Sequence, residues 1–243
     1  GAKHSENPVG VDVSSKEMLR YGFPLALTTS MGFSIPLVEK LVIRQATSWD
    51  ILAVYTAASI FITVMNMVKT TVSNIWTPYA YREYQNERKF KDAFFNIGIS
   101  MTFFVVCILA GTILTRRWLV LILDRGYADV MIIAPAIVCG SCFDVLSMIY
   151  SIGIYIKKKT INQIIVPIVR IIISIPVLFI GLPIWGLQAT GIGYLLSIAV
   201  SRTVEINMAL HYYGTGRRNY KLFVLMGMSI AVSMLSLFVT SML

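Results

Sequence analysis

The feature that most constrains this chain is a series of long apolar runs, separated by short connections that hold most of the charged residues. As an α-helix, each run reaches the roughly 30 Å needed to cross a bilayer core. The runs lack the polar–apolar alternation of a β-barrel, and an isolated strand would leave its backbone groups unpaired in lipid. The sequence therefore predicts an all-α, polytopic membrane helical bundle of about seven transmembrane helices. The predicted spans are residues 22–45, 51–77, 93–115, 129–156, 161–181, 187–212 and 220–242.

Composition supports a membrane protein. Hydrophobic residues make up 56% of the chain and charged residues 14%, with a mean hydropathy of +0.73. Because soluble domains carry about 25% charged residues, this composition disfavours a soluble enzyme, a disordered tail, a coiled coil and a disulfide scaffold. Cys139 and Cys142 have redox-motif spacing but lie inside an apolar run, so we expect them to be small packing residues. No Cys/His cluster has metal-ligand spacing, and we expect neither a metal nor another cofactor.

The basic residues predict the orientation. Twelve Lys and Arg residues flank the spans on one side of the predicted membrane and four flank them on the other. By the positive-inside rule, the N-terminus is cytoplasmic and the C-terminus lies outside the plasma membrane. The net charge of +9 thus reflects mostly the basic residues on the cytoplasmic side of the membrane, and nucleic acid is not an expected partner. The first side holds Lys16, Arg20, Arg82, Arg88, Lys89, Lys91, Lys157, Lys158, Lys159, Arg217, Arg218 and Lys221, and the second holds Arg44, Arg116, Arg117 and Arg125.

The connections are too short to hold a soluble active site, so we predict no catalytic residues and no enzyme activity. Aromatic residues gather at the ends of the predicted spans. Such residues are typical of interfacial belts. They are Trp49, Trp76, Tyr79, Tyr81, Trp118, Trp185, Tyr212 and Tyr213.

Charged residues inside the spans are the candidate site, because a charge in lipid is costly and usually functional. Four cations lie on four different spans and could line one cavity, which would suit an anionic substrate such as a phosphate. A fifth cation, Arg44, lies one helical turn from Lys40. The candidate substrate-binding cations are Lys40, Arg44, Lys69, Arg170 and Arg202.

Three acids accompany these cations, and their role stays open. Glu39, Asp144 and Glu205 are candidates either for coupling transport to an ion or for pairing that only holds the bundle together. Glu39 could pair with a cation of a neighbouring span, and Arg202 with Glu205 at a spacing of three.

Several segments carry a family resemblance, in their order and spacing rather than in one specific motif. Tyr21-Gly-Phe-Pro24-Leu-Ala-Leu opens the first span, Glu39-Lys40 follows, Ala53-Val54-Tyr55 opens the second span and Trp76-Thr-Pro78-Tyr-Ala-Tyr-Arg82 closes it. Lys157-Lys-Lys-Thr160 and Ile184-Trp-Gly186-Leu-Gln-Ala-Thr-Gly191-Ile-Gly193 come later. From about residue 18 to 215 the chain resembles the C-terminal half of polysaccharide biosynthesis proteins. These are the O-antigen-type flippases of the multidrug/oligosaccharidyl-lipid/polysaccharide exporter superfamily.

The chain departs from the pattern of that family at three places. Glu39-Lys40 stands where the family usually has Asp-Arg, so the charge signs are kept but the bidentate guanidinium is lost. Ala53 replaces the glycine of a Gly-x-Tyr pattern, and Gln188-Ala189-Thr190 replaces a glycine-alanine-alanine pattern. These differences affect the expected substrate specificity rather than the family.

The resemblance implies a MATE-like transporter fold, with two six-helix lobes facing each other across a central cavity. Residues 1–20 would be a cytoplasmic segment that leads from a missing N-terminal lobe of the same protein. Residues 21–215 would form the six-helix C-terminal lobe, and residues 216–243 an additional transmembrane helix. The start at Gly1 rather than Met agrees with a preceding lobe.

The resemblance also implies a function. The expected activity is translocation of an undecaprenyl-diphosphate-linked oligosaccharide across a prokaryotic inner (plasma) membrane for surface polysaccharide assembly. Glycan polymerase or assembly proteins are further candidate partners. Two alternatives stay open: a MATE-type drug or cation antiporter, and a non-transporting membrane scaffold of a glycan assembly complex. A membrane-embedded glycan polymerase is disfavoured, since no large outside loop with a catalytic Arg or His is present.

Overall fold

The computed structural model describes residues 15–83, 129–157 and 159–213, with separate positions between 97 and 111 and at Gly227 and Ile230. Every regular element in this part of the chain is helical. The elements are α1 (Ser15–Ala46), α2 (Trp49–Glu83), α4 (Val130–Ile156), the 3-10 turn η2 (Thr160–Ile164), α5 (Ile165–Trp185) and α6 (Leu187–Tyr213).

Four of the described helical segments are long and apolar enough to cross a membrane. They are Met18–Ala46, Trp49–Glu83, Val130–Ile156 and Thr160–Trp185. The prediction of an all-α membrane protein is confirmed at that level. The predicted spans 93–115 and 220–242 lie largely outside the described residues, so the count of seven stays a prediction.

Helix α6 matches the predicted span 187–212 in its bounds but is not among those four. The reason lies in its polar residues, which include Arg202, Glu205 and Asn207. Glu205 is buried with 3% of its surface exposed, and Arg202 has a side chain that is 20% exposed. The polarity of α6 is therefore partly directed into the bundle, where other side chains can pair with it.

The connection between α5 and α6 is much tighter than the sequence predicts. The predicted spans 161–181 and 187–212 leave residues 182–186 as a connection, but only Gly186 interrupts the two helices. Its φ of +51° is a conformation that L side chains rarely adopt, which explains a glycine at this point. The Gly186 N–H donates to the Leu182 carbonyl at 3.0 Å, so the end of α5 stays hydrogen-bonded while the chain reverses.

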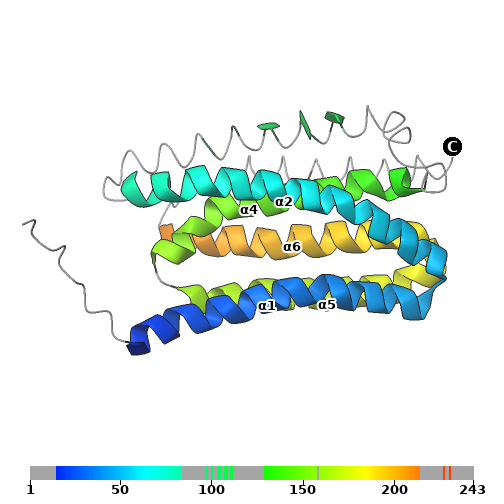
Figure 1. Cartoon of the computed structure of the whole chain (residues 1–243), viewed down its shortest axis with the longest axis horizontal. Helices are drawn as coiled ribbons and strands as arrows, with labels where there is room; N and C mark the ends of the chain where they lie inside the picture. The colour runs from blue at the N-terminus through cyan, green and yellow to red at the C-terminus, as the bar shows by residue number, and fades with distance from the viewer. Residues whose placement is uncertain are drawn as a thin grey trace, which may run out of the picture.

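Helices α4 and α6 form the centre of the bundle (Figure 1). Helix α2 packs on α4, α5 packs on α6, and α1 lies along α5. Small residues bring the central pair together, as is typical of membrane helix interfaces. A Cβ on Gly140 would lie 2.8 Å from Cε1 of Tyr194, and one on Gly191 would lie 3.2 Å from Cβ of Ile133.

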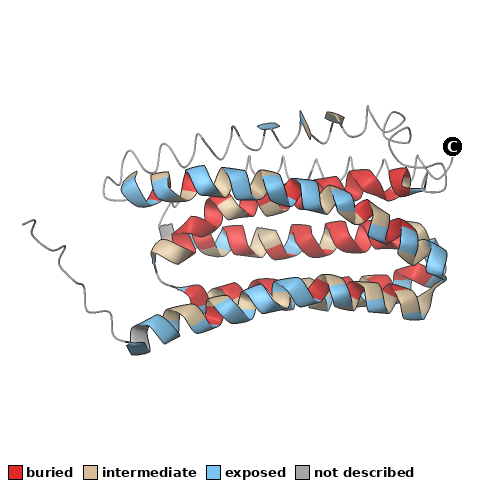
Figure 2. Ribbon diagram, viewed as in Figure 1, coloured by how far each residue is buried: buried red, intermediate tan, exposed pale blue. Residues whose placement is uncertain are grey.

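Burial differs sharply between the centre and the outside of the bundle (Figure 2). Helix α4 is buried along most of its length, including Ile133, Ile137 and Ile149, which are 0% exposed. The outer helices instead expose large apolar side chains, such as Phe33 on α1 at 75% and Ile75 on α2 at 72%. Such apolar outer faces would be costly in water and match the hydrocarbon of a bilayer.

Trp76 corrects one sequence prediction. It was assigned to an interfacial belt, but its side chain is buried in the core, with 4% exposed. Its indole Nε1 donates to the Ile149 carbonyl at 3.1 Å, which joins α2 to α4. A buried indole needs such an acceptor. Trp49 and Trp185 are 66% and 46% exposed, which leaves the belt assignment in place for them.

Candidate functional site

Glu39 on α1 is almost completely buried, with 1% of its surface exposed. Its carboxylate accepts hydrogen bonds from three side chains on two other helices. Arg170 Nη2 donates at 3.2 Å and Ser174 Oγ at 2.8 Å, both from α5, and Tyr55 Oη donates at 3.1 Å from α2. Arg170 and Ser174 are four residues apart, so they lie on one face of α5. We call these four residues the Glu39 cluster.

A second group of charges surrounds Asp144 on α4. Lys69 Nζ of α2 lies 2.9 Å from Oδ2 of Asp144, and Arg202 Nε of α6 contacts Oδ1. Arg202 also donates from Nη1 to Oε2 of Glu205 at 2.8 Å. We call these four residues the Asp144 cluster. Asp144 is shared between two cations from two different helices.

Tyr194 on α6 lies beside Arg170 of the Glu39 cluster, and its ring centroid is 5.6 Å from the guanidinium carbon. Its hydroxyl is 3.2 Å from Ser141 Oγ on α4. The single Ser141 proton is donated to the Ile137 carbonyl at 2.9 Å, so the Tyr194 hydroxyl must be the donor to Ser141. Tyr194 thus lies between Arg170 of the Glu39 cluster and Ser141, which is three residues before Asp144 on α4, so the two clusters border one polar interior.

The two clusters together are electrically balanced. Lys69, Arg170 and Arg202 supply three positive charges, and Glu39, Asp144 and Glu205 supply three negative ones. All five long helices of the described chain contribute to this interior. The pairings expected for Arg202 with Glu205, and for Glu39 with a cation of another span, are confirmed. A role of these cations in substrate binding stays a prediction.

Lys40 and Arg44 lie outside both clusters. They are half-buried, one turn apart, near the end of α1. The Arg44 guanidinium lies over the ring of Trp49, 3.8 Å from its centroid. Within the described ranges no carboxylate forms an ion pair with either residue. The structure thus separates the five predicted cations into three paired ones and this adjacent pair.

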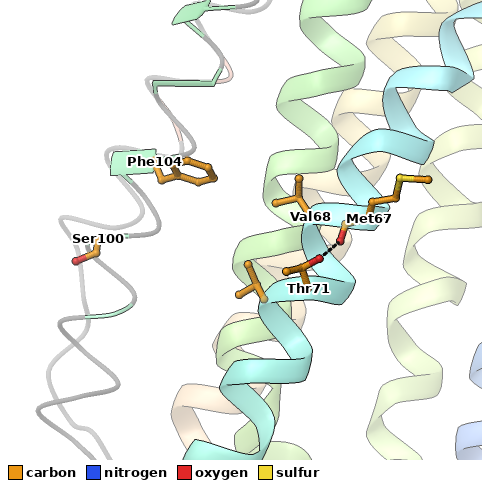
Figure 3. A pocket seen from close by; sticks show the side chains of 6 residues that line it. Met67, Val68, Thr71, Ser100 and Phe104 are labelled. Atoms are coloured by element: carbon orange, nitrogen blue, oxygen red, sulfur yellow. Dashed lines mark hydrogen bonds between the residues drawn. The ribbon is translucent and has the colours of Figure 1, made fainter.

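An apolar groove lies on the outer side of α2 (Figure 3). Met67, Val68, Thr71 and Val72 line it on α2, opposite Ser100 and Phe104, and its volume is about 500 Å³. Thr71 Oγ1 donates to the Met67 carbonyl at 2.9 Å, so its hydroxyl is already satisfied. The groove therefore offers an almost wholly apolar surface, separate from the hydrogen-bonded charges described above.

Four polar residues of this interior were missed from the sequence: Tyr55, Ser141, Ser174 and Tyr194. Ser174 had a detectable signal, since it lies one turn beyond Arg170 on the same helix face. The other three contact groups on distant helices, so no local spacing could reveal them. Ser141 lies within the Cys139-Gly-Ser-Cys142 segment, which packs against Tyr194. No group of His, Cys, Asp and Glu that could hold a metal occurs among the described residues.

Comparison with known proteins gives a family match for the first half of the chain. Residues 8–124 match the family model described as polysaccharide biosynthesis protein. No curated protein and no solved structure matches the chain. The match covers somewhat less than half of the chain and includes α1 and α2, and thus Glu39, Tyr55 and Lys69. It supports membership of this family and suggests a role in polysaccharide synthesis or export.

Proposed function

We propose that this protein translocates a lipid-linked oligosaccharide, carried on a polyprenyl diphosphate, across the plasma membrane for polysaccharide assembly. The observation that supports this most is the family match over residues 8–124. This range includes α1 and α2, two helices that are long and apolar enough to cross a bilayer and that carry Glu39 and Lys69 of the two clusters. A diphosphate-linked glycan cannot cross hydrocarbon unaided, so its carrier needs buried polar groups that can pair with it.

Lys69 is the cation best placed to meet a phosphate. Its side chain is 30% exposed, the highest value in the two clusters. If Lys69 turned toward a ligand, Asp144 would keep Arg202 as a partner. In contrast, Glu39 has no second cationic partner among the described side chains, so moving Arg170 would leave a buried acid uncompensated. We therefore assign phosphate contact first to Lys69 and keep Lys40, Arg44, Arg170 and Arg202 as further candidates.

The proposal also covers the arrangement of lobes and the orientation of the chain in the membrane. Residues 21–215 would form one lobe of a MATE-like transporter, with residues 1–20 leading from another lobe and residues 216–243 adding a helix. The N-terminus would face the cytoplasm and the C-terminus the outside. Asp144 and Glu205 would be the groups to test for ion coupling, since they share Arg202.

Deletion of the gene tests the transport proposal. Surface polysaccharide and lipid-linked intermediates would be measured together in the deletion strain and after complementation. We expect loss of surface polysaccharide, with intermediates accumulating on the cytoplasmic face. Unchanged polysaccharide with new sensitivity to cationic drugs would contradict the flippase and favour a MATE-type antiporter.

A non-transporting scaffold of a glycan assembly complex is the second candidate, because the charge balance of the two clusters favours it. Three cations paired with three acids can hold a bundle together without any ligand. A scaffold predicts loss of surface polysaccharide with intermediates on the outer face, because translocation would continue while assembly failed.

A further inference from the structure

The charge balance of the two clusters leaves two predicted cations near the end of α1 without an acid among the described residues. Of the five basic side chains predicted inside the spans, three are neutralised by three acids. The remaining two, Lys40 and Arg44, are neighbours on α1 and together carry two positive charges. Asp50, in the first turn of α2, is exposed and forms no ion pair with Arg44 in the described structure.

The contact with Trp49 fixes Arg44 without using its hydrogen-bond donors. A guanidinium stacks on an aromatic ring through its face, whereas its N–H groups lie along its edge. The guanidinium carbon lies 3.8 Å from the ring centroid, and no carboxylate of the described residues forms an ion pair with Arg44. Lys40, one turn away, adds a second donor on the same side of α1. Two adjacent cations with available donors suit a phosphate oxygen better than a neutral group.

A hollow beside this pair is suited to hydrocarbon. Trp49, Leu52, Ala53, Thr56 and Ala57 line a hollow of about 470 Å³ along the first turns of α2. Small side chains there leave room on a helix that otherwise exposes bulky ones, such as Ile60 at 55%. Trp49 belongs to both features, since it supports Arg44 and forms one end of the hollow.

We propose that Lys40, Arg44 and the Trp49 hollow bind an anionic membrane phospholipid, with its phosphate on the two cations and an acyl chain in the hollow. The site lies at the α1–α2 turn, where helix ends and an exposed tryptophan are typical of the headgroup level. A soluble phosphate would use the cations but not the apolar hollow, so the combination favours a lipid. This inference goes beyond the proposed transport function and does not rest on it: it assigns Lys40 and Arg44 to a phospholipid, while Lys69 remains the first candidate for the substrate phosphate.

Native mass spectrometry of the purified 243-residue chain tests the proposal. The delipidated protein would be titrated with dioleoyl phosphatidylglycerol and, separately, with dioleoyl phosphatidylcholine, in the same detergent. We expect retention of phosphatidylglycerol over phosphatidylcholine. Lys40→Gln/Arg44→Gln should weaken binding of phosphatidylglycerol by roughly fivefold for each cation removed. Equal retention of the two lipids by the unaltered protein would overturn the proposal.

A matched control removes two exposed cations elsewhere. Arg82→Gln/Lys159→Gln makes the same change in net charge far from the hollow and should retain most of the binding. Equal weakening in both double variants would show that the effect comes from net charge alone and would overturn the proposed site.

Crosslinking tests the site even if the first double variant fails to fold. A photoreactive benzoylphenylalanine at Thr56 should capture phosphatidylglycerol in preference to phosphatidylcholine, whereas one at exposed Ile75 should show no preference. The same preference for phosphatidylglycerol at Thr56 and at Ile75 would also overturn the proposed site.

Discussion

The two charged clusters in the interior each neutralise a buried acid, but with different numbers of cations. Glu39 is a single acid, with its side chain 2% exposed, held by one cation and two hydroxyl groups. Asp144 is 17% exposed and stands between two cations, one of which has a second acid. The Glu39 cluster therefore has one arrangement that satisfies it, whereas the Asp144 cluster keeps a charge partner when either cation moves.

This difference predicts that the Glu39 cluster mainly stabilises the bundle, whereas the cations of the Asp144 cluster can exchange partners. In a low-dielectric interior, removing the only cation beside a buried acid leaves an uncompensated charge. The resulting loss of folding free energy is far larger than the stability that the ion pair adds over two apolar residues in its place. A shared acid with redundant partners is less sensitive to the loss of one. We expect substitutions in the Glu39 cluster to unfold the bundle and substitutions at Lys69 to change what the protein binds.

The largest effect is expected for Arg170→Met. Removing the guanidinium leaves Glu39 buried without a cation, and we expect the free energy of unfolding to fall by about 3–5 kcal/mol. Unfolding in detergent by titration with dodecyl sulfate, followed by circular dichroism, would measure it. The double variant Glu39→Gln/Arg170→Met should recover part of the loss. A single-variant loss smaller than that of Lys69→Gln would contradict the distinction between the clusters.

The next largest effect is expected for Asp144→Asn. Lys69 loses its ion pair, while Arg202 keeps Glu205, so the loss should be about 1.5–3 kcal/mol. The same unfolding titration would measure it. A loss above that of Arg170→Met would show that Asp144, rather than Glu39, is the group on which the bundle depends.

A smaller effect is expected for Gly140→Ala, which tests the position of Tyr194 beside the Glu39 cluster. The added Cβ would lie 2.8 Å from Tyr194 Cε1, so the ring must shift. Overpacking of about 1–3 kcal/mol is partly offset by the higher helix propensity of alanine, which leaves a net loss of about 1 kcal/mol. Gly32→Ala on α1 is the control, since its Cβ would meet nothing within 4 Å. Equal changes in the two variants would show that the contact with Tyr194 contributes little.

The smallest effect on stability is expected for Lys69→Gln. Its side chain is 30% exposed, and Asp144 keeps Arg202, so we expect a loss below about 1 kcal/mol. Thermal unfolding in the same detergent would measure it against Arg82→Gln, which removes an exposed cation paired with Glu83. A loss of several kcal/mol would place Lys69 with the structural charges.

The sequence predicted the features that depend on local pattern. Apolar length gave the positions of α1, α2 and α4, and a spacing of three gave the pair of Arg202 with Glu205. The sharp reversal at Gly186 was missed because apolar length alone does not show that α5 and α6 continue up to a single left-handed residue. Trp76 was misassigned because belt and core tryptophans look alike until the acceptor on α4 is known.

The contacts between helices could not be read in the same way. Asp144 is 75 residues from Lys69, and Glu39 is 131 residues from Arg170, so only the packing of the bundle brings them together. The sequence placed both acids and both cations inside spans but could not say which would pair. The contrast between Glu39 and Asp144 therefore emerges only from the arrangement of the helices.

The most direct test of the account is the Lys69→Gln variant in a strain that lacks the native gene. Surface polysaccharide and the amount of folded protein would be measured in the same cells, with Lys69→Arg as the charge-preserving control. The account predicts that Lys69→Gln lowers surface polysaccharide while protein levels stay normal, and that Lys69→Arg restores it. Normal polysaccharide with Lys69→Gln would contradict the account and make the Asp144 cluster a structural element like the Glu39 cluster.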